Sequence, residues 1–350
     1  MKHILNELKD RAVFRLKAFD HVPERLFEEL DYINEHGGAH VLLYLSGLVR
    51  HLRAEGIFVG AGYGSQTCSL MCYGLGVTDI NPLLWNLPFE SFTKSFVPET
   101  IFTIRTSTGG YRKALEYIVS HQMENPVDQD TLEKREIDVF FPGEVHYFAL
   151  QIRIAENVNL DILNNLQKER STRLSLMELD EATLQIFRDG ECGAVMGFGT
   201  PKQAEYVKRL GPECFSDLYL IYSILQSGKP EMLEEIKRRK SYYGKQATGL
   251  VDVDRILAES YGALVYHEQA ILIEKALLHT PYSPEVRAVR LMLETDKDNL
   301  KSKGNAIAMT KEAVEQAFFK ARYPEVFSKA FRAAREYRIH EIKNNNKEYD

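Results

Sequence analysis

The stretch that decides the fold is Gly56–Phe92, GIFVGAGYGSQTCSLMCYGLGVTDINPLLWNLPFESF. It begins with three apolar residues, Ile57–Val59, which predict a short strand. The glycine-rich turn Gly60–Ser65 follows, and the apolar spacing of Cys68–Leu75 then predicts a helix. Such a turn can hold phosphate, because glycines let backbone N–H groups approach the ligand and a helix begins with positive partial charge. By itself the turn has neither the lysine of a Walker A loop nor the GxGxxG spacing of a dinucleotide site.

Hydrophobic spacing divides the rest of the chain into a mixed part and a helical part. Apolar residues recur every three or four positions in residues 4–55, which predicts helices. The alternating segment 99–106 predicts a half-buried strand. A helix at 111–121 and two more strands at 136–141 and 144–152 follow, and the pattern is helical from residue 154 onward. We therefore expect an α+β fold with a helical lead-in at 1–55, a small sheet domain at 56–153, a helical domain at 154–340 and a frayed tail at 341–350.

The composition indicates a soluble globular protein. Its 350 residues are 44% hydrophobic, which suffices for two or three domains with cores of their own. A formal net charge of −6 argues against a protein that coats nucleic acid non-specifically, because phosphate binding needs clustered lysine and arginine. No apolar run approaches the roughly 20 residues that a membrane helix needs. We expect a cytoplasmic protein with no membrane partner, whose cysteines are reduced core thiols, namely Cys68, Cys72, Cys192 and Cys214.

The residues after the glycine turn point to a family. The turn G-x-G-x-G-S is followed by a predicted helix, then by Thr78-Asp79 and Asn81-Pro82-Leu83, and then by Phe89-Glu90-x-Phe92. This order and spacing resemble the palm of the bacterial DNA polymerase III alpha subunit, which is a C-family DNA polymerase. The combination is far more specific than the glycine turn alone.

Three later segments resemble the fingers of the same family. Residues 193–230 contain the pattern L-x-P-x-x-F-x-D, from Leu210 to Asp217. Residues 261–269 read YGALVYHEQ and resemble the family's Y-G-x-x-x-Y-x-E-Q segment, and 320–327 read KARYPEVF and resemble K-A-x-Y-P-x-x-F. The segments follow the family's order, so the chain resembles a truncated and degenerate palm-plus-fingers relative.

The resemblance implies a polymerase beta-like nucleotidyltransferase palm sheet in 56–153, with a reduced thumb, followed by a mainly helical fingers-like domain in 154–340. It also implies that Gly62, Gly64 and Ser65 hold the triphosphate of an incoming nucleotide. In the family, three aspartates on adjacent strands bind two Mg²⁺ ions, which activate the primer hydroxyl and stabilise the leaving pyrophosphate.

Those three aspartates have no counterpart in the matching segments of this chain. The family places two of them in a strand of pattern P-D-x-D-x-D-F, and the matching segment 98–106 reads PETIFTIRT, with Glu99 as its sole acid. The third lies in a strand like V-K-F-D-F-L-G-L-R. Here 145–153 read VHYFALQIR, which puts Phe148 at the aspartate's position. The sequence therefore predicts an inactive nucleotidyltransferase site with no cofactor.

Two other functions stay open. The chain could be an active DNA-directed DNA polymerase that binds Mg²⁺ through unorthodox ligands, for which the weak candidates are Glu99, Glu136 and Asp138. Glu136 and Asp138 would share one face of a strand, but they follow the helix at 111–121, whereas the family's acidic strand precedes the matching helix. Alternatively, the chain could be a purely structural protein-interaction subunit.

A basic run in the helical part gives the candidates for DNA binding. It consists of Lys237, Arg238, Arg239 and Lys240, whose charges could contact backbone phosphates. A solvated helix end is the simpler interpretation of the same run. With the family resemblance, the expected partners are DNA or proteins of replication and repair.

Overall fold

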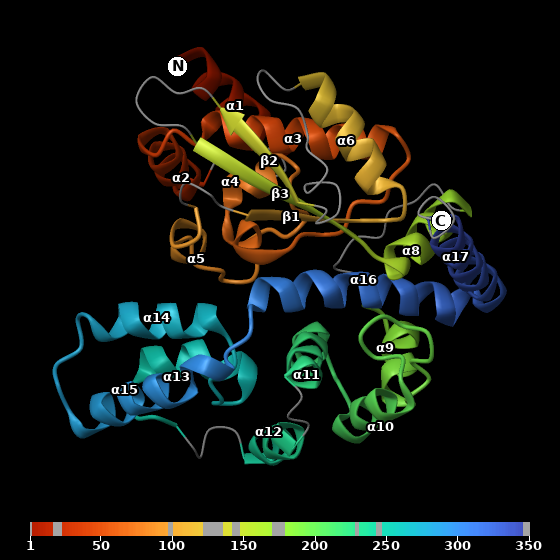
Figure 1. Cartoon of the computed structure of the whole chain (residues 1–350). Helices are drawn as coiled ribbons and strands as arrows, with labels where there is room; N and C mark the ends of the chain where they lie inside the picture. Colours follow the sequence, from red (N-terminus) through yellow and green to blue (C-terminus); the bar gives the residue numbers. More distant parts are fainter. Residues whose placement is uncertain are drawn as a thin grey trace. The chain divides into compact units, whose positions relative to one another are not determined.

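The computed structural model describes residues 2–16, 23–96, 101–121, 136–141, 148–169, 179–227, 231–242 and 247–345. The chain forms two compact units, Met1–Arg173 together with Glu325–Asp350, and Leu174–Pro324 (Figure 1). The sequence predicts a boundary near residue 153. In the structure, the helix that follows the sheet and the last helix of the chain also belong to the first unit.

The first unit contains three long N-terminal helices, a small sheet and several short elements. In chain order these are α1 (Lys2–Leu16), α2 (Glu24–Glu35), α3 (Ala39–Ala54), the 3-10 helix η1 (Gly64–Cys68), α4 (Leu70–Gly74), α5 (Glu90–Thr93), β1 (Ile101–Thr106), α6 (Gly110–His121), β2 (Glu136–Phe141), β3 (Phe148–Glu156), α8 (Val158–Glu169) and α17 (Pro324–Asn345). Helix α17 therefore includes residues 341–345, which the sequence assigns to a frayed tail, and 346–350 lie outside the described residues.

The sheet has three strands in the order β1-β3-β2. Strands β1 and β3 are parallel, while β2 runs antiparallel to β3. On one face Phe102 is in register with Ile152, and Ile104 with Ile154, and all four side chains are buried. This alternation explains why the segments are strands, because every second residue enters the core. The predicted strands at 99–106 and 136–141 are confirmed over their described residues.

The third predicted strand, 144–152, extends further along the chain in the structure. Strand β3 begins at Phe148 and continues to Glu156, because its pairing with β1 runs on to Thr106 opposite Glu156. Residues 144–147 lie outside the described residues, as do 122–134, where a reduced thumb is expected.

Aromatic packing links the sheet to the N-terminal helices. The rings of Phe92 and Phe96 stack with their centroids 4.8 Å apart, and Phe96 meets Phe102 of β1 edge to face at 6.2 Å. Gly38, between α2 and α3, is required at this point, because a Cβ there would lie 2.3 Å from the Phe96 ring. Gly38 therefore serves the core as well as the turn.

One local prediction was wrong, and a second was confirmed only in part. Instead of a strand, Ile57–Val59 makes one isolated bridge, Val59 to Thr106, because the chain turns away after Gly60 donates to the Arg105 carbonyl. The helix predicted over Cys68–Leu75 is present as α4, but it begins at Leu70, because Ser69 has an extended backbone and its side chain caps a new helix after η1 ends at Cys68.

The second unit is wholly helical over its described residues. Its elements are α9 (Glu181–Arg188), α10 (Pro201–Leu210), α11 (Phe215–Gln226), α12 (Glu231–Tyr242), α13 (Val251–Leu257), η2 (Ala258–Ser260), α14 (His267–Leu277), α15 (Pro284–Asp296), η3 (Lys297–Asn299) and α16 (Lys303–Arg322). A mixed sheet in one unit and helices in the other confirm the α+β fold class.

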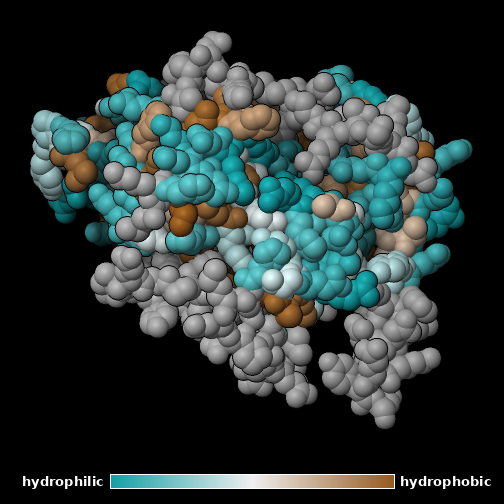
Figure 2. Space-filling view, turned by 90° about the horizontal axis from the view of Figure 1, so that it is seen from above, coloured by the Kyte–Doolittle hydropathy of each residue, from teal (hydrophilic) through white to brown (hydrophobic). Residues whose placement is uncertain are grey.

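Two further features concern the solvent-facing surface and the apolar length of the helices. On the face seen in Figure 2, hydrophobic residues are scattered in small patches among hydrophilic ones. Within the described part of the chain, no helix is both long enough and apolar enough to span a bilayer.

Cys68, Cys72 and Cys192 are buried free thiols as predicted, but Cys214 is exposed, because it precedes α11 in an extended conformation at the surface.

Candidate functional site

The glycine turn is held in shape by backbone and threonine contacts. Gly62 has a φ of +145°, and a Cβ on it would lie 2.4 Å from the Thr78 hydroxyl, so only glycine fits. The Thr78 hydroxyl donates to the Ala61 carbonyl at 2.8 Å. Gly64 has a φ of +68°, in the left-handed region that favours glycine, and its carbonyl accepts from the Thr67 hydroxyl at 2.7 Å. The turn is therefore fixed by the protein itself.

An internal carboxylate occupies the start of the helix that follows the turn. Glu29 of α2 is fully buried and accepts hydrogen bonds from Ser69 Oγ at 2.7 Å, from Leu70 N at 2.9 Å and from Met71 N at 2.8 Å. Arg25, one turn earlier on α2, pairs with Glu29 at 2.9 Å. These amide groups, which sequence reasoning offers to phosphate, are therefore already satisfied. The i,i+4 pair of Arg25 and Glu29 was a sequence signal of such a contact.

Burial and hydrogen bonding act on Glu29 in opposite directions. Burial raises the pKa of the Glu29 carboxyl, whereas Arg25 and the donors of Met71, Leu70 and Ser69 lower it, and the pKa lies above its usual value of 4.5. The carboxyl is thus a costly buried group whose partners are all supplied by the protein.

A cavity lies between the glycine turn and the sheet. It measures about 190 Å³ and is lined by residues of the turn, of η1 and of two strands, namely Tyr63, Gly64, Ser65, Gln66, Ile101, Phe102, Thr103 and Arg153. Of the three predicted nucleotide-binding residues, Gly64 and Ser65 line the cavity, while Gly62 packs against Thr78 and Thr67. The structure thus brings part of the predicted phosphate turn to the parallel strands.

The sheet wall of this cavity carries an arginine. Thr103 of β1 is in register with Arg153 of β3, and both side chains line the cavity. Counting from Pro98 along the pattern P-D-x-D-x-D-F, the second and third acids fall on Ile101 and Thr103. Among the described side chains that line the cavity none is a carboxylate, so this donor set does not fit Mg²⁺, which prefers anionic oxygen ligands.

Gln66 is a cavity residue that sequence reasoning missed. Its side chain is 4% exposed, and Nε2 donates to the Thr103 carbonyl at 2.9 Å. Its Oε1 atom has no hydrogen-bond partner among the described residues. A glutamine directly after Gly-Ser in the turn was the available sequence signal.

The three weak catalytic candidates are not brought together over the described residues. Glu99 lies outside them. Glu136 and Asp138 belong to β2, where the backbone register pairs them with Arg153 and Gln151 of β3. Phe148 is the first residue of β3. No group of three His, Cys, Asp or Glu side chains that could hold a metal ion occurs in the described part of the chain.

The four basic candidates of α12 fall into two classes. Arg239 pairs with Glu235 at 2.8 Å and donates to the Gly262 carbonyl at 3.0 Å, and Lys240 pairs with Glu213 at 2.7 Å and Asp217 at 3.0 Å. Their charges are used inside the second unit. Lys237 is exposed, as is Arg238, whose side chain is 57% exposed although it also pairs with Glu235.

Glu235 is the common partner of the two arginines. Their hydrogen bonds lower the pKa of this exposed carboxyl to about 2. Its charge therefore offsets part of the positive charge of α12 at neutral pH. The contribution to stability is small, because exposed ion pairs are screened by solvent.

Asp217, the acid of the L-x-P-x-x-F-x-D pattern, joins α11 to α12 and to the Tyr261 turn. Burial raises the pKa of its carboxyl, but hydrogen bonds from Tyr261, the Glu213 N–H and Lys240 outweigh burial and bring the pKa below the usual 3.8. The Tyr261 hydroxyl donates at 2.6 Å. The ionised form is therefore favoured by folding.

We expect Asp217→Asn to destabilise the second unit at pH 7 and to lose less stability on acidification than the parent chain. A carboxyl whose pKa is lowered by folding stabilises the fold above its unfolded pKa, about 3.9, and loses that contribution as the pH falls through the folded pKa. Hydrogen exchange of α11 at a series of pH values measures this. Asp252→Asn, at a carboxylate 70% exposed, is the control and should show no such change. A constant difference between Asp217→Asn and the parent at all pH values would contradict the prediction.

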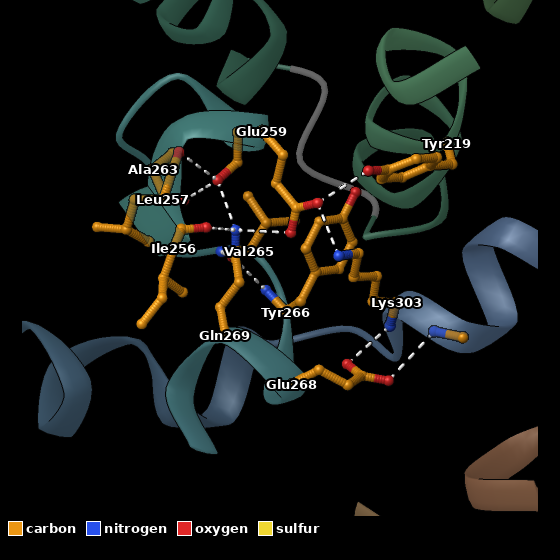
Figure 3. Close-up of polar contacts among 12 residues, drawn as sticks. Tyr219, Ile256, Leu257, Glu259, Ala263, Val265, Tyr266, Glu268, Gln269 and Lys303 are labelled. Carbon is orange, nitrogen blue, oxygen red and sulfur yellow. Dashed lines mark hydrogen bonds and ion pairs between the residues drawn. The ribbon is translucent and has the colours of Figure 1, made fainter. Parts of the chain in front are cut away.

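The Y-G-x-x-x-Y-x-E-Q segment forms a buried polar network (Figure 3). Gln269 accepts from the N–H groups of Val265 and Tyr266 at 3.0 and 3.1 Å, and its Nε2 donates to Ser260 Oγ at 2.7 Å. Glu268 accepts from the first N–H groups of α16, those of Lys303 at 2.8 Å and Gly304 at 3.1 Å. The motif therefore ties η2 and α14 to the start of α16.

Lys303 completes this network from the other side. It is 4% exposed, and its ammonium group pairs with Glu259 at 2.7 Å (Figure 3). Glu259 also accepts from the Tyr219 hydroxyl of α11 at 2.9 Å. A lysine in the first turn of a helix is unfavourable alone, and here the carboxylates of Glu259 and Glu268 compensate it. Both acids therefore have structural partners inside the second unit.

Comparison with known proteins places these motifs in a family. Residues 2–97 match the model of the bacterial DNA polymerase III alpha NTPase domain, and residues 157–316 match that of the bacterial DNA polymerase III alpha subunit finger domain. The chain is a relative of the bacterial DNA polymerase III alpha subunit. The two matched ranges leave out residues 98–156, which carry β1, α6, β2 and β3 of this polymerase III alpha relative.

Individual members of the family are similar over parts of the chain. The chain is 45% identical over 69 residues to a DNA polymerase III subunit alpha of Mycobacterium leprae, and 41% identical over 69 residues to an error-prone DNA polymerase of Cutibacterium acnes. It is 38% identical over 99 residues to the DNA polymerase III subunit alpha of Escherichia coli. These alignments cover 20%, 20% and 26% of the chain, and 6%, 6% and 8% of the relatives. The chain thus spans a small part of the proteins it matches.

Proposed function

We propose that this polymerase III alpha relative is a noncatalytic member of the family, which binds nucleotide phosphate at the palm cavity without transferring nucleotides. It would act with DNA and with proteins of replication or repair. The observation that supports this proposal is the lining of the cavity, where Ile101, Thr103 and Arg153 stand beside the Gly64–Ser65 turn.

The chemistry of that lining favours an anion over a metal ion. A two-metal site needs carboxylates that hold both ions a few ångströms apart. A guanidinium repels divalent cations and binds phosphate oxygens directly. Arg153 would therefore contact a phosphate that also meets the N–H groups of Gly64 and Ser65, while the Thr103 hydroxyl could add a hydrogen bond.

Contacts with DNA would come from the free surface of α12. Lys237 and Arg238 are exposed, although Arg238 also pairs with Glu235, whereas Arg239 and Lys240 are half-buried and are held by acids of their own unit. Lysine and arginine on one exposed helix face can bind backbone phosphates with strong salt dependence. The proposed DNA contact therefore rests on Lys237 and Arg238 alone.

Primer extension and nucleotide binding test the proposal together. We expect no incorporation with Mg²⁺ or Mn²⁺, and binding of a nucleoside triphosphate that persists in EDTA, because no metal is needed. Arg153→Ala should weaken this binding by on the order of tenfold, the value of a lost charged hydrogen bond. Arg112→Ala, at an exposed arginine of α6, is the control.

Two outcomes would favour the other functions. Extension product that Asp138→Ala abolishes would support an active polymerase with unorthodox ligands, Glu99, Glu136 and Asp138, and would refute the noncatalytic proposal. Absence of both nucleotide binding and salt-dependent binding of primed DNA would support a purely structural subunit.

A further inference from the structure

The second unit contains a cavity that the family resemblance does not assign. It measures about 250 Å³, which is larger than the palm cavity of about 190 Å³. Its lining residues come from α11 and α12, from the segment before α14, and from the end of α15 and the connection to α16. The lining consists of Ser223, Ile224, Ser227, Met232, Leu264, Val265, Asp296, Asn299 and Lys301.

The lining has an apolar part and a polar part. Ile224, Met232, Leu264 and Val265 offer flat hydrocarbon surface, and the remaining residues offer a carboxylate, an ammonium, an amide and two hydroxyls. In sites of this composition, the apolar side chains pack against the ligand and a few polar groups form hydrogen bonds that fix its orientation. The cavity is smaller than the roughly 300–1,000 Å³ of sites for drug-sized ligands, so it suits a single ring system.

The two charged residues of the lining have their backbones firmly placed. Lys301 donates its N–H to the Val265 carbonyl at 2.9 Å and accepts from the His267 N–H at 3.0 Å. Asp296 ends α15 directly before η3. Both are half-buried, and neither makes an ion pair with another described residue. The cavity therefore offers a carboxylate that can accept hydrogen bonds and an ammonium group that can donate them to the same ligand.

We propose that this cavity binds a guanine base. The ring would lie against Ile224, Leu264 and Val265, with the Asp296 carboxylate accepting from the ring N1–H and the exocyclic amino group. Lys301 or Asn299 would donate to O6, the carbonyl next to N1–H, and to N7 on the adjacent edge. Guanine alone among the common bases presents two adjacent N–H donors on its pairing edge beside a carbonyl. Adenine and cytosine place an unprotonated ring nitrogen there, and uracil flanks its N–H with two carbonyls, so each would set a lone pair against the carboxylate.

Calorimetric titration of the full chain with nucleosides tests the base preference. Nucleosides lack phosphate, so binding at the palm cavity does not contribute and the two proposals can fail separately. Guanosine should bind more tightly than adenosine, cytidine or uridine by about tenfold to a hundredfold, the range of a good bidentate contact. Equal binding of all four nucleosides, or binding of none, would overturn the proposal. A parallel titration with oligothymidine that carries one guanine distinguishes a free nucleoside from a base within a strand.

Asp296→Asn provides a change of specificity that misfolding cannot imitate. An amide has one donor and one acceptor, which match the C2 carbonyl and N1–H of xanthosine, so the variant should lose guanosine and gain xanthosine. Asp298→Asn removes the same charge two residues away, at an exposed position that does not line the cavity, and should keep the parent's preference. Equal effects of the two variants, or an Asp296→Asn chain that still prefers guanosine, would refute the assignment.

Discussion

Glu29→Ala is expected to lower the free energy of unfolding of the first unit by about 3–5 kcal/mol, the cost of leaving a buried charge unpaired. The substitution would leave the donors of Ser69, Leu70 and Met71 without their acceptor. It would also remove the carboxylate that neutralises Arg25, whose guanidinium would keep only its bonds to the Leu87 and Cys68 carbonyls. Denaturant unfolding followed by tryptophan fluorescence measures the effect. The chain has one tryptophan, Trp85, and it belongs to this unit.

Two further variants separate the carboxylate's role from simple truncation. Glu29→Gln keeps the shape and one acceptor, so its loss should lie between the parent and Glu29→Ala. Glu28→Ala, at the exposed neighbouring position of α2, should change stability by less than about 0.5 kcal/mol. If Glu28→Ala and Glu29→Ala unfold at the same denaturant concentration, the buried carboxylate is not what joins α2 to α4.

Lys303→Met should destabilise the second unit by about 3 kcal/mol, again because it leaves a largely buried charge, that of Glu259, without its partner. Hydrogen exchange of the peptides from α14 and α16 measures the effect in this unit alone. Lys297→Met, at an exposed lysine of η3, is the matched control. The double variant Lys303→Met with Glu259→Gln should lose less than the sum of the two single changes, because the pair acts as one unit. Additive losses would show that Lys303 and Glu259 act independently.

Local sequence patterns were sufficient for the elements whose own residues decide their structure. The alternation of Phe102 and Ile104 predicts β1, and the helix at 111–121 appears as α6. The predicted helix over Cys68–Leu75 begins two residues late, at Leu70, because Ser69 caps it and donates to Glu29, forty positions earlier in the chain. A contact of that range leaves no mark in a window of ten residues.

The same distinction between local and long-range contacts decides which residues of the candidate sites could be predicted from the sequence. The glycines of the turn could be found from sequence, since their positive φ values are a local requirement. The basic run of α12 could be found, but not that Arg239 and Lys240 are engaged by Glu235, Glu213 and Asp217. Arg153 gave no signal as a cavity residue, because only the pairing of β3 with β1 brings it beside Thr103.

The internal bracing of the glycine turn has a thermodynamic consequence. Three contacts within the chain fix the turn. Gly62 packs against Thr78, the Thr67 hydroxyl donates to the Gly64 carbonyl, and the Gln66 side chain donates to the Thr103 carbonyl. A ligand that enters the cavity therefore meets a receptor that is already preorganised, and little conformational entropy is lost in shaping the loop around it. The turn would also keep its shape when the residues at the reacting positions of the sheet are substituted. None of the contacts that hold the turn uses the side chains at those positions.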